Sequence, residues 1–78
     1  MLNKVIDIIL NYVEPDDEIT DKTSIKGDLG MSSFDIVCLS GELYEVFGVE
    51  LSPEDFRECD TVGLLTEIIE ERSKAFNQ

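Results

Sequence analysis

Asp28-Leu29-Gly30-Met31-Ser32-Ser33-Phe34-Asp35 decides how this chain folds, because it closes a long polar connection and begins a helix. Gly30 permits a tight turn before the helix. Ser32 occupies the N-cap position and Asp35 follows three residues later, which is the spacing of a capping box. Ser33 then falls at the first helical position, and we expect its hydroxyl to face solvent beside the unpaired helix amides. A phosphate ester on that oxygen would be stabilised by the helix dipole.

The helix that begins here is predicted over residues 33–47, and Gly48 is expected to end it as a C-terminal cap. Gly41 lies inside this helix, where glycine is less favourable than alanine by about 1 kcal/mol, so a packing or functional reason is expected for it. The predicted buried stripe consists of Ile36, Leu39, Leu43, Val46 and Phe47.

Three further helices are predicted. Apolar residues at helical spacing indicate a first helix over residues 2–13, closed by Pro15. A short helix over residues 53–58 follows a second capping sequence, Ser52-Pro53-Glu54-Asp55, with Phe56 as its buried anchor. Asp60 is expected to cap the last helix, residues 61–74, and the chain is expected to fray after it. The inward positions of this last helix are Val62, Leu65, Ile68 and Ile69.

Residues 14–31 form a long polar connection, which Ile19, Ile25 and Leu29 are expected to hold against the core. Its aspartates lack the spacing of a calcium-binding loop. The whole chain, residues 1–78, is therefore predicted to be one all-α domain. We expect a four-helix bundle with three longer helices, one short helix and a long loop between the first two.

The composition excludes several classes of function. The net charge of −12 disfavours nucleic acid and anionic membranes as partners and favours basic protein surfaces. The absence of histidine removes most metal sites and the Ser–His and Cys–His nucleophile systems. Two cysteines, no signal peptide and no apolar run of membrane-spanning length point to a reducing cytoplasm. The chain begins with its own Met1, and we expect a discrete monomeric protein.

The pattern Asp28-Leu29-Gly30, then Ser33 followed by a large apolar residue and Asp35, resembles the attachment motif of acyl carrier proteins. The resemblance continues in two more stretches, Glu45-Val46-Phe47-Gly48-Val49-Glu50-Leu51 and Asp60-Thr61-Val62-Gly63, and covers residues 19–69 without a gap. It implies the same four-helix architecture. It also implies that Ser33, rather than Ser32, carries 4'-phosphopantetheine transferred from coenzyme A.

In this family the second helix is the docking surface for basic patches on acyl synthases, transferases and the phosphopantetheinyl transferase. Asp35, Glu42 and Glu45 match that role in kind. Cys38 and Tyr44 occupy positions where glutamate is common, and Ser32 one where aspartate is common. The helix is therefore less acidic than is typical of the family.

Gly41 occupies a position that often carries a bulky apolar side chain near the acyl pocket of the family. We therefore expect a pocket between the second and fourth helices that is enlarged at Gly41. Its other predicted residues are Leu43, Phe56, Leu65 and Ile68. The predicted function is a non-enzymatic acyl carrier in fatty acid or polyketide-type biosynthesis. Two alternatives stay open: an aminoacyl or peptidyl carrier, and an unmodified acidic adaptor that binds basic proteins.

Overall fold

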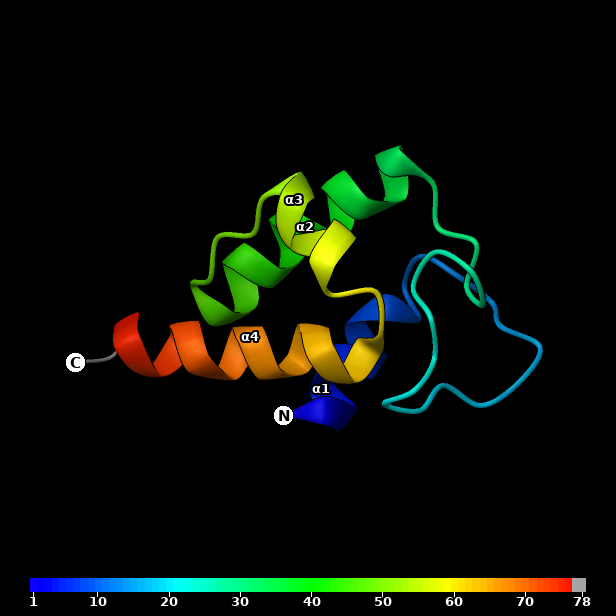
Figure 1. The fold of residues 1–78 in the computed structure, drawn as a ribbon, viewed down its shortest axis with the longest axis horizontal. Helices are drawn as coiled ribbons and strands as arrows, with labels where there is room; N and C mark the ends of the chain where they lie inside the picture. The colour runs from blue at the N-terminus through cyan, green and yellow to red at the C-terminus, as the bar shows by residue number, and fades with distance from the viewer. Residues whose placement is uncertain (77–78) are drawn as a thin grey trace.

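The computed structural model describes residues 1–76 of the chain as four helices around one core. They are α1 (Leu2–Ile9), α2 (Ser33–Phe47), α3 (Pro53–Glu58) and α4 (Val62–Phe76). Figure 1 shows α4 running along the molecule, with α2 and α3 on one side of it and the long connection at one end. The residues described form no strand; Ser24 and Thr61 make an isolated bridge. The predicted all-α fold with one short helix is confirmed.

Helix α1 is shorter than predicted, because it ends at Ile9 rather than Val13. Beyond Ile9 the backbone tightens into bonds between residues three apart: Asn11 N donates to the Ile8 carbonyl at 3.1 Å, and Tyr12 N to the Ile9 carbonyl at 2.9 Å. Tyr12 still packs against the core from this turn, and its hydroxyl donates a hydrogen bond to Glu42 of α2 at 2.6 Å.

Helix α2 has the predicted bounds, and both of its ends form as expected. The capping box is present, and Gly48 ends the helix at φ 71°. Leu39 and Leu43 are fully buried, whereas Val46 is 44% exposed. The prediction that Val46 is buried is therefore wrong: it lies on the same side of α2 as Leu39, but in the last turn of the helix, where its side chain is only partly covered.

Helix α3 also has the predicted bounds, and Ser52 and Asp55 form the second capping box. The predicted cap of α4 is wrong. Leu64 N donates to Thr61 Oγ1 at 3.2 Å, so Thr61 caps this helix. The Asp60 carboxylate instead accepts a hydrogen bond from Ser24 Oγ of the connection at 3.2 Å.

The far end of α4 lies two residues beyond the predicted limit of 74, at Phe76. Part of the predicted frayed end, residues 77–78, falls outside the described residues.

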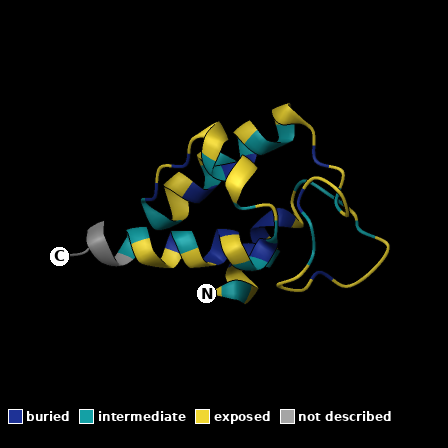
Figure 2. Ribbon diagram, in the orientation of Figure 1, coloured by how far each residue is buried: buried dark blue, intermediate teal, exposed yellow. Residues whose placement is uncertain are grey.

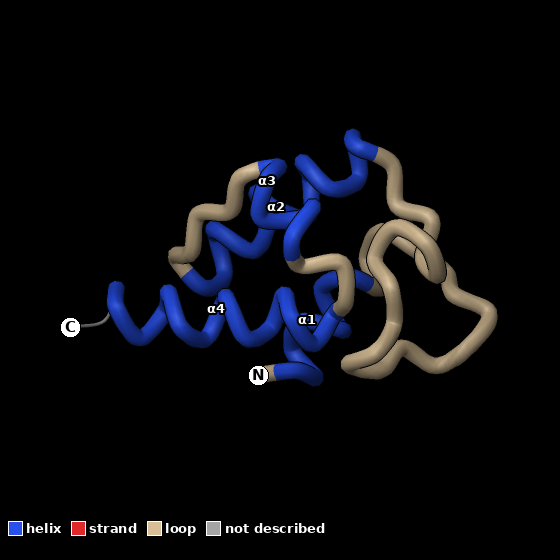
Figure 3. Tube along the Cα trace, in the orientation of Figure 1, coloured by secondary structure: helices blue, strands red, loops and turns tan. Residues whose placement is uncertain are grey.

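The long connection is held against the first turn of α4 (Figure 3). Ile25 N donates to the Asp60 carbonyl at 2.7 Å, and Gly63 N donates to the Asp21 carbonyl at 2.8 Å. Ile19 and Ile25 are buried and Leu29 packs against the core, which confirms the three predicted anchors. The loop is therefore built into the fold even though it has no helix of its own.

The core lies between the inward faces of the helices and the connection, as the burial colours of Figure 2 show. Helix α1 packs against both α2 and α4, and α2 packs against α3. Arg72 joins α4 to α3 through a two-pronged ion pair with Asp55, at 2.9 and 3.0 Å. The fully buried side chains of the core are Val5, Ile9, Ile25, Leu39, Leu43, Val49, Val62, Leu65 and Ile69.

None of the helices in residues 1–76 combines the length and apolar character needed to cross a membrane.

Candidate functional site

Ser33 is the first residue of α2, and it is exposed. The hydroxyl of its neighbour Ser32 is occupied, because it accepts a hydrogen bond from Asp35 N at 3.2 Å. Asp35 Oδ2 in turn accepts from Ser32 N at 3.1 Å. Ser33 takes no part in this reciprocal pair. Ser32 therefore has a structural role as the helix cap, whereas the Ser33 side chain is not used by the cap, as expected from the sequence.

The turn before α2 fixes the direction in which Ser33 is presented. Gly30 has φ +62°, a conformation that residues with a side chain rarely adopt, and no atom lies within 4 Å of where its Cβ would be. Met31 follows it and is buried at 6% exposure. A tight turn with a buried anchor thus places the two serines at the surface. The first-turn amides and the positive end of the helix dipole make the Ser33 position compatible with a phosphate ester.

An apolar cavity of about 180 Å³ lies between α2 and α3. Ser33, Val37 and Ser40 fall within roughly 60° of one another around the helix, so the cavity is on the same side of α2 as Ser33. It begins about one helical turn beyond Ser33. The residues that line it are Ile36, Val37, Ser40, Leu51, Pro53 and Phe56.

Of the five predicted pocket residues, only Phe56 lines this cavity. Leu43 and Leu65 are fully buried in the core, and Ile68 packs against it. Gly41 does not join them: it is exposed, and a Cβ there would meet nothing within 4 Å. Gly41 therefore lies on the outer surface of α2 rather than between α2 and α4.

The other five residues that line the cavity were not predicted as pocket residues, because the pocket was expected between α2 and α4 rather than between α2 and α3. One signal was available. Leu51 precedes the short helix and Phe56 lies within it, and both are large apolar residues that are buried.

The three predicted docking acids have different environments. Asp35 is held in the capping box. Glu42 accepts hydrogen bonds from the Tyr12 hydroxyl at 2.6 Å and from Asn11 Nδ2 at 3.1 Å. The hydrogen bond to Glu42 is the larger cause, and burial the next, of a rise in the pKa of Tyr12 to about 12. Glu45 is exposed.

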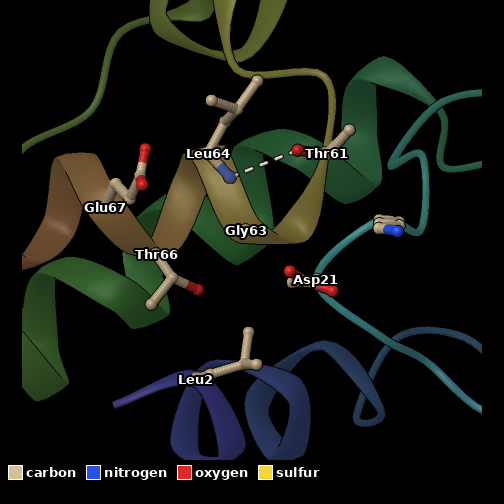
Figure 4. Close-up of a pocket in the computed structure, with 8 residues that line it drawn as sticks. Leu2, Asp21, Thr61, Gly63, Leu64, Thr66 and Glu67 are labelled. Atoms are coloured by element: carbon tan, nitrogen blue, oxygen red, sulfur yellow. Dashed lines mark hydrogen bonds between the residues drawn. The ribbon is translucent and has the colours of Figure 1, made fainter.

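A second hollow, of about 420 Å³, lies between the start of α1, the connection and the start of α4 (Figure 4). The close-up shows Leu2 of α1 facing Thr66 of α4, with Asp21 of the connection beside Gly63. No residue of α2 lines it. This hollow is therefore separate from the Ser33 site.

The cysteines and acids among the described residues are further candidates for reactive or metal-binding groups. Cys38 and Cys59 are free thiols, and burial raises the pKa of Cys59. The side chains that the structure describes include no group of three or more acids and cysteines placed to hold a metal ion.

A family model described as the phosphopantetheine attachment site matches residues 3–69, which is most of the chain. The match includes the turn, Ser33, the cavity between α2 and α3, and the first turns of α4. Members of this family carry a covalent 4'-phosphopantetheine group, which a phosphopantetheinyl transferase attaches and partner enzymes then use. The structure offers a suitable place for that group at the start of α2. The chain belongs to the phosphopantetheine attachment site family of carrier domains.

Proposed function

We propose that this protein is an acyl carrier whose 4'-phosphopantetheine is attached to Ser33 through a phosphodiester. When bound, the group supplies a thiol that holds the acyl chain as a thioester. The proposal is supported by the different roles of the two serines: Ser32 Oγ accepts the capping hydrogen bond from Asp35 N at 3.2 Å, whereas Ser33 is exposed and takes no part in the cap. The helix N-terminus stabilises the added phosphate charge.

The apolar cavity between α2 and α3 favours acyl cargo over aminoacyl or peptidyl cargo. Its volume of about 180 Å³ is close to that of an engineered cavity of about 150 Å³ that binds benzene. The cavity is therefore suited to roughly six carbon atoms without movement of the helices, and an amino or peptide group would lose its hydrogen bonds to water there.

The other functional roles follow from the carrier proposal. The protein does no chemistry of its own; it presents its cargo to a phosphopantetheinyl transferase and to acyl synthases and transferases with basic docking surfaces. Its net charge of −12 suits such surfaces. We propose that it works as a monomer in the cytoplasm, in fatty acid or polyketide-type biosynthesis.

Mass measurement after incubation with coenzyme A, magnesium and a phosphopantetheinyl transferase tests the attachment site. The parent and Ser32→Ala should gain the mass of one phosphopantetheine, whereas Ser33→Ala should gain none. Ser32→Ala is a matched control, since it removes a neighbouring hydroxyl and weakens the helix cap by about 1 kcal/mol. Modification of Ser33→Ala would refute the assignment, and an unmodified parent would favour the acidic adaptor.

The cargo is tested by thermal unfolding of the carrier loaded with acyl groups of increasing length. A chain that enters the cavity interacts with the folded state only, so the melting temperature should rise with each added carbon and level off near six. Aminoacyl groups of the same size are the control and should give a smaller rise. Equal rises in melting temperature for the acyl and aminoacyl series would favour the aminoacyl or peptidyl carrier instead.

A further inference from the structure

Exposed apolar side chains are concentrated on α2. Among the described residues, seven large apolar side chains are exposed, and four of these belong to α2: Phe34 at 75%, Val37 at 64%, Tyr44 at 56% and Val46 at 44%. The other three lie outside α2: Met1 and Leu10 flank α1, and Leu64 belongs to α4. Single exposed apolar residues are ordinary, but a group of them on one helix marks an interaction surface.

Phe34, Val37, Gly41 and Tyr44 follow one another at intervals of three, four and three residues, and together they are called the α2 stripe. At about 100° per residue they span roughly 80° of the helix, on the side opposite Leu39 and Leu43. The α2 stripe begins at the residue after Ser33. A partner that handles a group on Ser33 therefore meets the stripe directly.

Gly41 makes a notch in the middle of the stripe. No atom lies within 4 Å of where its Cβ would be. Two surface hollows, of about 370 and 530 Å³, lie on either side of the helix, and Gly41 lines both. Ser40, Tyr44, Glu50 and Leu51 also line the first, and Tyr12, Cys38, Glu42, Glu45 and Val46 the second.

The charges around the notch have one sign. Helix α2 contains no lysine or arginine, and Glu50 and Glu45 stand at the two hollows. A second copy of this chain is a poor occupant, because each copy carries a net charge of −12 and would bring the same carboxylates to the contact. The complementary surface is apolar at its centre and basic at its rim.

We infer that partner enzymes dock on the α2 stripe by inserting one apolar side chain into the notch at Gly41, while flanking lysine or arginine side chains pair with Glu45 and Glu50. This inference rests on the carrier function proposed above and identifies how its partners are chosen. Gly41 is then a specificity-determining position: a partner shaped for a flat or filled helix surface loses the central contact. Docking depends on fit at the notch more than on the three acids that the sequence indicates.

The test is the rate at which the phosphopantetheinyl transferase of the same organism modifies Gly41→Leu, Gly41→Ala and the parent. Leucine fills the notch, so KM should rise about tenfold, and alanine, which adds one methyl group, should raise it about threefold. Tyr44→Ala should raise KM about fivefold, because Tyr44 lines one of the hollows at Gly41. Phe34→Ala should raise KM by a similar factor, because it removes the exposed apolar side chain at the Ser33 end of the α2 stripe. Glu45→Gln should lower the association rate and its dependence on salt.

Leu64→Ala is the matched control, since Leu64 is also 45% exposed but lies on α4, and its KM should stay within about twofold of the parent. Thermal unfolding must show that Gly41→Leu is folded, as the open space around this position predicts. An unchanged KM for Gly41→Leu, or an equal rise for Leu64→Ala, would overturn the docking inference while leaving the carrier function intact. A parent protein that is never modified would instead refute the carrier function.

Discussion

Two glycines inside helices should respond in opposite directions to the same change, glycine to alanine. Gly41 lies in the middle of α2, and a Cβ there would meet no atom within 4 Å. Gly63 is the second residue of α4, and a Cβ there would lie 2.8 Å from the Asp21 carbonyl oxygen and 3.0 Å from Asp21 Cβ. The same carbonyl accepts the hydrogen bond from Gly63 N at 2.8 Å, so it is fixed in place.

The magnitudes follow from these distances. Gly41→Ala should stabilise the protein by about 0.5–1 kcal/mol, because alanine is the better helix former and nothing obstructs it. Gly63→Ala gains less at a helix end and must push back a backbone segment, and overpacking of this kind costs about 1–3 kcal/mol. The expected net loss for Gly63→Ala is therefore about 0.5–2 kcal/mol.

Urea unfolding and thermal unfolding of the two variants beside the parent measure both effects. In a domain of this size, 1 kcal/mol corresponds to a shift of about 4–8 °C in the melting temperature. The melting temperature should rise for Gly41→Ala and fall for Gly63→Ala. A rise for Gly63→Ala would refute the claim that the connection is packed rigidly against α4 at Asp21, and a fall for Gly41→Ala would refute the claim that a side chain is accommodated freely at Gly41.

Two further predictions concern pH. Hydrogen bonds from Arg72, and then from the Ser52 backbone, lower the pKa of Asp55 to about 2, so its stabilising effect is complete above about pH 4 and is lost as the pH falls toward 2. Because Arg72 is 41% exposed, Arg72→Gln should lower stability by only about 1 kcal/mol at pH 7, and urea unfolding from pH 2 to 7 should show a weaker acid dependence than in the parent; parallel pH profiles would contradict this. The pKa of Tyr12 is raised to about 12 by its bond to Glu42, so the stability it adds is present below pH 10 and is lost between pH 10 and 12. Tyr12→Phe should lower the free energy of unfolding by about 1 kcal/mol at neutral pH and should abolish the loss of stability between pH 10 and 12. Urea unfolding from pH 8 to 12 measures both effects, and an alkaline loss equal to that of the parent would contradict the role of this bond.

The features that depend on neighbouring residues could be predicted from the sequence alone. The two capping boxes set the starts of α2 and α3, and the left-handed Gly48 set the end of α2. These signals act over three or four residues, so they can be identified without knowing what surrounds them. The exposed place of Ser33 at the first helical position follows from the same local geometry.

The neighbours of each side of α2 could be known only from the tertiary structure. Periodicity placed Leu39 and Leu43 on the buried side of this helix, and both are buried, but periodicity carries no information on which helix each side will meet. Packing against α1 and α3 makes the selection and leaves Gly41 on the surface.

The remaining corrections have the same origin in contacts between residues far apart in the chain. Tyr12 bonds to Glu42 across 30 positions, and Asp60 bonds to Ser24 across 36. The first contact accompanies the early end of α1, and the second leaves Thr61 to cap α4. Such partners come together only when the core forms. The burial of apolar side chains determines how the helices pack, and local preferences do not.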